Sequence, residues 1–136
     1  MPWRRKTGEE RDAGATSVEL VVYIPLLMLV IFVTVQFALS WHGNSIAGAV
    51  AREAARVARA GGGTSAAIAE AQSRGMEYAE AIGGAALRDV TIEVTSVPGD
   101  EIRVTVSGRA AEIVDGMAPR VEATVQGPVE VFRPDT

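Results

Sequence analysis

A long apolar segment near the N-terminus constrains this chain more than any other feature. No residue from Leu20 to Leu39 carries a formal charge, and only Pro25, Thr34 and Gln36 interrupt the apolar run. As an α-helix this stretch extends about 30 Å, which is the thickness of the hydrocarbon core of a bilayer. A core helix of a soluble domain is seldom so long and apolar on every side. Residues 15–40 are therefore predicted to form a transmembrane helix.

Glu19 stands at the leading edge of this span. A carboxylate in that position costs about 2–3 kcal/mol unless it reaches the headgroups or pairs with a cation. Two interpretations follow. Glu19 either lies in the headgroup layer without a specific role, or it pairs with a positive group and serves the function of the protein.

The charges on either side of the span bear on orientation and partners. Four basic residues precede it, and the positive-inside rule then places a short head, residues 1–14, in the cytoplasm. Residues 41–136 become one small extracytoplasmic domain. This domain is acidic on balance, which argues against a nucleic-acid-binding surface. The chain has no cysteine, so disulfides, thiolate metal sites and thiol chemistry are excluded.

A cleaved secretory signal is the alternative interpretation of the apolar segment. Ala38-Leu39-Ser40 would serve as a small-residue cleavage site. The apolar region of a signal peptide usually has about 7–15 residues, however, and the run here is longer. Its length favours an anchor that is retained.

Two helices are predicted beyond the span. Over residues 44–60, an apolar stripe of Ile46, Val50, Ala54 and Val57 indicates an amphipathic helix that extends the transmembrane helix, with Gly43 as a bend. The triple glycine at 61–63 ends it. A second helix follows over residues 65–82, with its apolar stripe at Ile68, Ala71, Gly75, Tyr78 and Ile82.

The first of these helices also carries a basic stripe, formed by Arg52, Arg56 and Arg59. Such a stripe is either a solvated face or a surface for a protein partner. The three arginines are the candidate partner surface of the domain.

The sequence period then changes from helical to two. Residues 90–97 and 101–107 are predicted to form a hairpin in which Val94 faces Val104 and Ile92 faces Val106. A third strand is predicted over residues 120–132, with Val121, Ala123 and Val125 facing inward. Pro128 interrupts it, and the remainder would continue on a sheet edge. The fold class is therefore α+β, with an N-terminal transmembrane helix, a second helix and an antiparallel sheet of about three strands.

The sequence offers no set of catalytic residues. His42 is the only histidine, and it stands beside Trp41 at the expected membrane surface. No His, Asp or Glu cluster has metal-ligand spacing, and no serine lies in a nucleophile elbow. We therefore expect no enzyme activity, no cofactor and no metal.

Two short motifs point to a family. Residues 11–19, RDAGATSVE, precede an apolar run that contains Pro25, and residues 51–56, AREAAR, follow the membrane. Together they resemble TadE-like proteins of the tight-adherence, or Flp-type, pilus assembly machinery of bacteria. The resemblance covers about residues 11–60, and the remainder agrees only in general architecture.

The resemblance implies specific roles for several residues. In type IV pilins and their pseudopilin relatives, a membrane prepilin peptidase cuts on the cytoplasmic side after a glycine, and a glutamate stands fifth in the mature chain. Here Gly14 fits the cleavage position, Ala15 becomes the first residue, and Glu19 is the fifth. Glu19 would then pair with the new amine of Ala15 on a neighbouring subunit.

The same resemblance suggests how the span packs against other subunits. Pro25 would break the helix locally, which is tolerated within a bundle. Gln36 would face another helix, although many family members have an acidic residue there. Ala15 also departs from the family, because pilins commonly begin with an aromatic residue or methionine.

The sequence thus suggests a non-enzymatic, single-pass pseudopilin-like component of a Flp/Tad-type pilus or secretion apparatus in the bacterial cytoplasmic membrane. Its expected partners are other pilus or pseudopilin subunits, assembly-platform membrane proteins and the prepilin peptidase. It would act within the filament or in its assembly. The alternative is a membrane-tethered or secreted domain unrelated to pili, in which residues 90–132 bind a ligand or protein.

Overall fold

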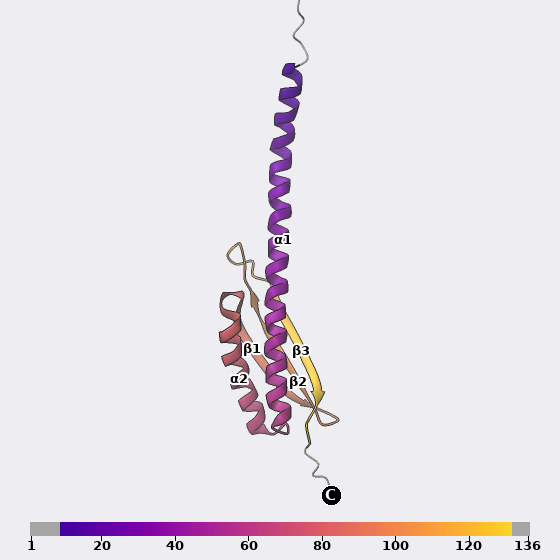
Figure 1. Ribbon diagram of the computed structural model, residues 1–136, viewed down its shortest axis with the longest axis vertical. Coiled ribbons are helices and arrows are strands. Elements are labelled where there is room, and N and C mark those ends of the chain that lie inside the picture. Colours follow the sequence, from indigo (N-terminus) through magenta and orange to yellow (C-terminus); the bar gives the residue numbers. More distant parts are fainter. Residues whose placement is uncertain (1–8, 132–136) are drawn as a thin grey trace, which may run out of the picture. The chain divides into compact units, whose positions relative to one another are not determined.

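The computed structural model describes the backbone of residues 9–131 and the side chains from Thr16 onward (Figure 1). Two long helices precede an antiparallel sheet of three strands, which confirms the predicted α+β class. In chain order the elements are α1 (Glu9–Ala60), α2 (Ser65–Gly83), the short 3-10 helix η1 (Gly84–Ala86), β1 (Leu87–Val97), β2 (Glu101–Ala110) and β3 (Arg120–Pro128).

The chain forms two compact units, which meet between Val35 and Gln36. The described part of the first unit is a single stretch of α1, and nearly all of its side chains from Thr16 onward are exposed. Within the described residues, one helix is long and apolar enough to cross a membrane, and none of its most apolar window is buried. This agrees with the predicted transmembrane helix.

The helix α1 passes through Pro25 as continuous helix, so the local break expected there is not observed. Proline removes one hydrogen bond, to the carbonyl four residues earlier, but the flanking bonds hold the helix on both sides. The amphipathic helix predicted over residues 44–60 is the C-terminal part of α1, which confirms that it extends the transmembrane helix.

Gly43 serves close packing within the second unit. The residue is buried, and a Cβ atom there would lie 2.9 Å from the Cβ of Ala110 and 3.2 Å from the carbonyl oxygen of Ala86. The helix does not end at Gly43. The absent side chain lets α1 approach the end of β2. Close packing therefore accounts for the glycine that the sequence analysis interpreted as a bend.

The strand register is the one predicted from the alternation of apolar residues. Val94 pairs with Val104, Ile92 with Val106 and Val97 with Glu101. The ladder shifts by a bulge between Arg88 and Thr91, an interval that includes the predicted start of the strand at residue 90. β1 and β2 both extend three residues past the predicted hairpin, to Leu87 and Ala110.

The third strand ends at Pro128 and not at residue 132, so the predicted continuation on a sheet edge is wrong for residues 129–131. Phe132, where that strand was expected to end, lies outside the described residues. The backbone N–H of Val129 donates to the carbonyl of Asp100 over 2.7 Å, and that of Glu130 donates to the carbonyl of Arg59. These bonds draw the chain out of the sheet once proline has removed a ladder donor.

In the second unit, α2 and the C-terminal part of α1 lie side by side on one face of the sheet (Figure 1). The core between them is built largely from alanine on the helices and from β-branched residues on the strands. Its fully buried large side chains are Val50, Ile102, Val104 and Val106. The predicted apolar stripe of α1 is confirmed, since Ile46, Val50 and Ala54 are buried and Val57 packs against them.

The buried face of α2 agrees with the predicted one in part: Ala71 and Gly75 are buried, and Ile68 packs against the core. Its buried residues recur every fourth position and are all small: Ala67, Ala71, Gly75, Ala79 and Gly83. Tyr78 and Ile82, predicted to be in the stripe, are 38% and 39% exposed. The reason is spatial, because a Cβ at Gly75 would lie 2.6 Å from Cδ1 of Ile92 and 3.3 Å from the Cβ of Ala54. A side chain at position 75 would therefore require Ile92 to shift.

Candidate functional site

The residues predicted for processing and subunit pairing lie in the first unit. Gly14 and Ala15 are within the helical backbone of α1, but their side-chain surroundings lie outside the description. Glu19 is exposed on α1. Its pairing with the amine of Ala15 on another subunit, and the cleavage after Gly14, stay predictions.

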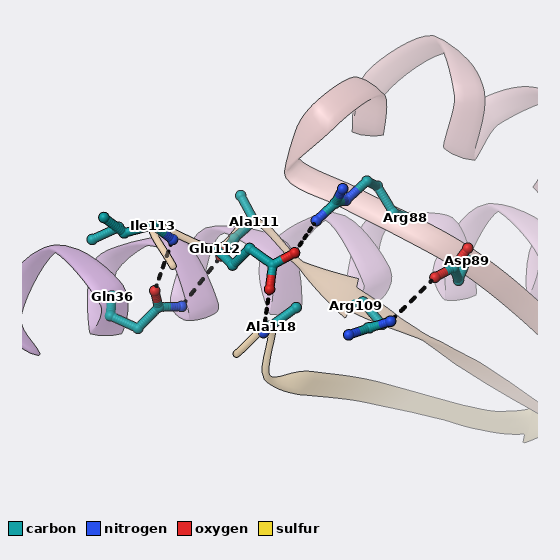
Figure 2. A network of polar contacts seen from close by, with 8 residues as sticks. All are labelled: Gln36, Arg88, Asp89, Arg109, Ala111, Glu112, Ile113 and Ala118. Atoms are coloured by element: carbon teal, nitrogen blue, oxygen red, sulfur yellow. Dashed lines mark hydrogen bonds and ion pairs between the residues drawn. The ribbon is translucent and has the colours of Figure 1, made fainter. Parts of the chain in front are cut away.

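Gln36 opens the second unit and is fixed to a loop that is distant in sequence. Its side-chain Nε2 donates to the carbonyl of Ala111 over 3.2 Å, and its Oε1 accepts the backbone N–H of Ile113 over 3.3 Å (Figure 2). Gln36 is partly buried by this arrangement. The amide expected to face another helix is therefore engaged within its own chain, and a role in subunit packing stays untested.

The loop that Gln36 holds, residues 111–119, is braced by Glu112. One carboxylate oxygen of Glu112 accepts from Nη2 of Arg88 over 2.8 Å, and the other accepts the backbone N–H of Ala118 over 2.6 Å (Figure 2). At the tip, the N–H of Met117 donates to the carbonyl of Val114, and Gly116 takes a φ of 85° that favours glycine. Sequence reasoning missed this network, because nothing local in residues 111–119 marks its partners.

The pKa of Glu112 reflects this environment. Partial burial acts to raise the pKa of Glu112, but the hydrogen bond and positive charge of Arg88 and the backbone N–H groups of Ala118 and Met117 outweigh it. The net result is a pKa below the ordinary glutamate value. Folding is therefore favoured by the ionised Glu112 above the unfolded pKa, and this contribution is lost as the pH falls through the lower, folded pKa.

We expect the amide resonance of Ala118 to titrate with the carboxyl of Glu112, at a midpoint below that of an unfolded glutamate. Two-dimensional NMR of the full chain in detergent during acidification measures this midpoint. A Glu112→Gln variant should abolish the transition, whereas Glu122→Gln, on the outer face of β3, should leave it in place. A midpoint at or above the ordinary glutamate value would contradict the bracing role of Glu112.

The three arginines of the candidate partner surface differ in their surroundings. Arg56 forms a bidentate pair with Glu53, with distances of 2.7 and 3.0 Å, and stays exposed. Arg59 instead donates from Nε to the carbonyl of Pro128 over 2.7 Å and closes the end of β3 against α1. Arg52 and Arg56 are exposed on the domain, whereas Arg59 has a structural contact inside it, and a partner for this surface stays a prediction.

The outer face of the sheet is polar and carries cross-strand contacts of its own. Arg103 donates to Gln126 over 3.0 Å, the hydroxyls of Thr105 and Thr124 lie 3.1 Å apart, and Gln126 also donates to Glu101. Among the described residues, no group of three His, Cys, Asp or Glu side chains is placed to hold a metal ion.

Comparison with known proteins gives one family. Residues 14–56 match the family described as TadE-like protein. No curated protein and no solved structure matches the chain significantly. The match begins at Gly14, contains Glu19 and Pro25, and ends within the part of α1 that packs on the sheet. The resemblance found in residues 11–60 is confirmed over this stretch, and the chain carries a TadE-like N-terminal segment.

Proposed function

We propose that this protein is a non-enzymatic, single-pass membrane component of a Flp/Tad-type pilus assembly or secretion apparatus, and that it is pseudopilin-like. The observation that carries the proposal is the TadE-like match over residues 14–56, which joins the apolar span to the domain helix in one stretch. The membrane-spanning length of α1 supports it.

The proposed mechanism uses the span as a packing element. The head, residues 1–14, stays in the cytoplasm, and the prepilin peptidase removes it after Gly14. Glu19 then neutralises the amine of Ala15 on a neighbouring subunit, in a layer where an unpaired charge is costly. The span packs with other pilus subunits or with assembly-platform proteins. The outer domain presents Arg52 and Arg56, both exposed, to an extracytoplasmic partner.

The N-terminus of the mature protein tests this proposal directly. We expect intact-mass and N-terminal analysis of the native membrane or sheared-surface fraction to give a chain that starts at Ala15. A Gly14→Val variant should retain the full head, because the cleavage that the family resemblance implies follows a glycine. The matched change in the head, Gly8→Val, should be processed normally.

Other termini would revise the proposal in defined ways. A native chain that starts at Met1 or Pro2 would remove the pairing of Ala15 with Glu19 and leave an uncleaved anchor. A chain that starts at Trp41 would identify an ordinary secretory signal and overturn the pseudopilin-like assignment.

A ligand-binding domain is the second candidate function, and the exposed polar face of the sheet supports it. On that hypothesis Gly14 and Glu19 are dispensable, and Thr105→Lys on the outer face removes ligand binding. On the pilus hypothesis, changes at Gly14 and Glu19 impair assembly and Thr105→Lys does not.

A further inference from the structure

Exposed apolar side chains gather at the end of the second unit where the chain enters it. Phe37 and Trp41, in the first turns that α1 contributes to this unit, are 67% and 68% exposed. The loop fixed to Gln36 adds Ile113, Val114 and Met117, which are 47%, 43% and 62% exposed. Isolated apolar residues on a surface are ordinary, but five at one end of a small domain favour an interaction surface there.

The covalent chain identifies what lies next to this group. The apolar span continues from Val35 through Gln36 and Phe37 to Leu39, so Gln36 lies in its last turns. The end of the domain that contains Gln36 therefore lies where the span leaves the bilayer, whatever the angle between the two units. Because Gln36 is hydrogen-bonded to Ala111 and Ile113, the loop lies at the same level.

We infer that residues 113–117 form a second membrane contact, in which Ile113, Val114 and Met117 enter the lipid interface beside Phe37 and Trp41. The inference rests on the membrane anchor proposed above. The occupant of the apolar surface is the outer part of the same leaflet into which the span is inserted. Trp41 suits this layer, where aromatic residues concentrate at membrane surfaces.

The polar groups of the loop are compatible with a shallow contact between residues 113–117 and the lipid. The carboxylate of Glu112 faces Arg88 and the backbone of Ala118, so its charge is neutralised within the domain (Figure 2). Asp115 stands exposed in the turn between Val114 and Met117. An unpaired carboxylate is costly in hydrocarbon, so Asp115 limits the contact to the headgroup layer and the first part of the acyl chains. The negative charge of Asp115 also gives no attraction to anionic lipid. The contact is therefore stabilised by burial of the apolar side chains.

Such a contact has a consequence for the domain. A domain attached through one helix is free to change its inclination to the membrane, whereas a second contact beside the helix restricts that motion. The loop would thereby set which face of the domain is presented to extracytoplasmic partners.

Single-cysteine labelling tests the inference on the full chain, which contains no cysteine of its own. Met117→Cys, Thr124→Cys and Val30→Cys each receive an environment-sensitive fluorophore and are reconstituted in phosphatidylethanolamine–phosphatidylglycerol vesicles. Lipids brominated near the headgroup or near the chain end serve as depth-dependent quenchers. Thr124 is the matched control on the outer sheet face, and Val30 reports on the span.

We expect the Met117 probe to be quenched several-fold more than the Thr124 probe, and more by shallow than by deep bromines. Quenching at Val30 but not at Met117 overturns the loop contact and leaves the anchor intact. The absence of quenching at both Val30 and Met117 overturns the anchor and the loop contact together. A Met117 probe shielded only after addition of a co-purified protein would assign the surface to a protein partner and also overturn the inference.

Discussion

A Glu19→Ala variant is expected to insert into the membrane normally and to fail in assembly with its pilus machinery. On the proposed mechanism, the variant leaves the amine of Ala15 without its partner in a poorly solvated layer. Removal of one member of a buried ion pair costs about 3–5 kcal/mol, which corresponds to a loss of about 100-fold or more in incorporation. The measurement compares the chain recovered with sheared or affinity-purified assemblies to the chain in total membranes.

Two further variants separate the charge from other effects of the substitution. Glu19→Gln keeps the size of the side chain and should fail as Glu19→Ala does. Val18→Ala, at an exposed position beside it, should assemble at the normal level. Normal assembly of Glu19→Ala would exclude the pairing and support the interpretation that Glu19 merely lies in the headgroup layer.

The parts of the fold that the sequence predicts well are those governed by local period. The hairpin register follows from alternation, since a slip of one residue would turn Ile92 and Val94 to the outer face and expose both. The span and the stripe at Ile46 and Val50 likewise follow from the spacing of apolar residues along one helix.

The parts that the sequence predicts poorly depend on contacts between distant segments. The stripe predicted for α2 from spacings of three and four residues included Tyr78 and Ile82, which are partly exposed. The close approach of α1 and β1 to α2 selects alanine and glycine instead, as the contacts around Gly75 show. Hydrophobicity thus indicates that a helix has a buried face, but size complementarity with its neighbours decides which face it is.

The candidate site shows the same division. Glu19 and Gly14 are recognisable in sequence because their spacing is local to the family motif. The partners of Gln36 lie 75 and 77 residues away, and Arg88 and Glu112 are 24 residues apart. The spacing of residues within one segment does not predict such contacts with a distant segment. The same is true of Arg59. Local spacing placed it in a basic stripe, but in the structure it donates a hydrogen bond to Pro128 at the end of β3.

An Ile102→Ala substitution is expected to give a large loss of domain stability, because Ile102 is the largest of the described side chains that are less than 2% exposed. It is 1% exposed and lies below the turn that joins α1 to α2, where a Cβ at Gly63 would be 3.1 Å from its Cδ1. An alanine core gives few flexible side chains that could fill the space, so a cavity should remain. Such deletions cost about 2–5 kcal/mol in the free energy of unfolding. Urea unfolding of the full chain in mild detergent, followed by circular dichroism, measures the loss.

Ile82→Ala is the matched control, since it deletes the same atoms from a side chain that is 39% exposed on the outer part of α2. Its cost should be well below that of Ile102→Ala, because a half-exposed site leaves no enclosed cavity and alanine favours the helix slightly. Equal losses in the two variants would show that the domain relaxes around Ile102 and that the close helix packing does not hold the core rigid. A larger loss for Ile102→Ala would place much of the stability of the domain in the packing of its small-residue helices against β2.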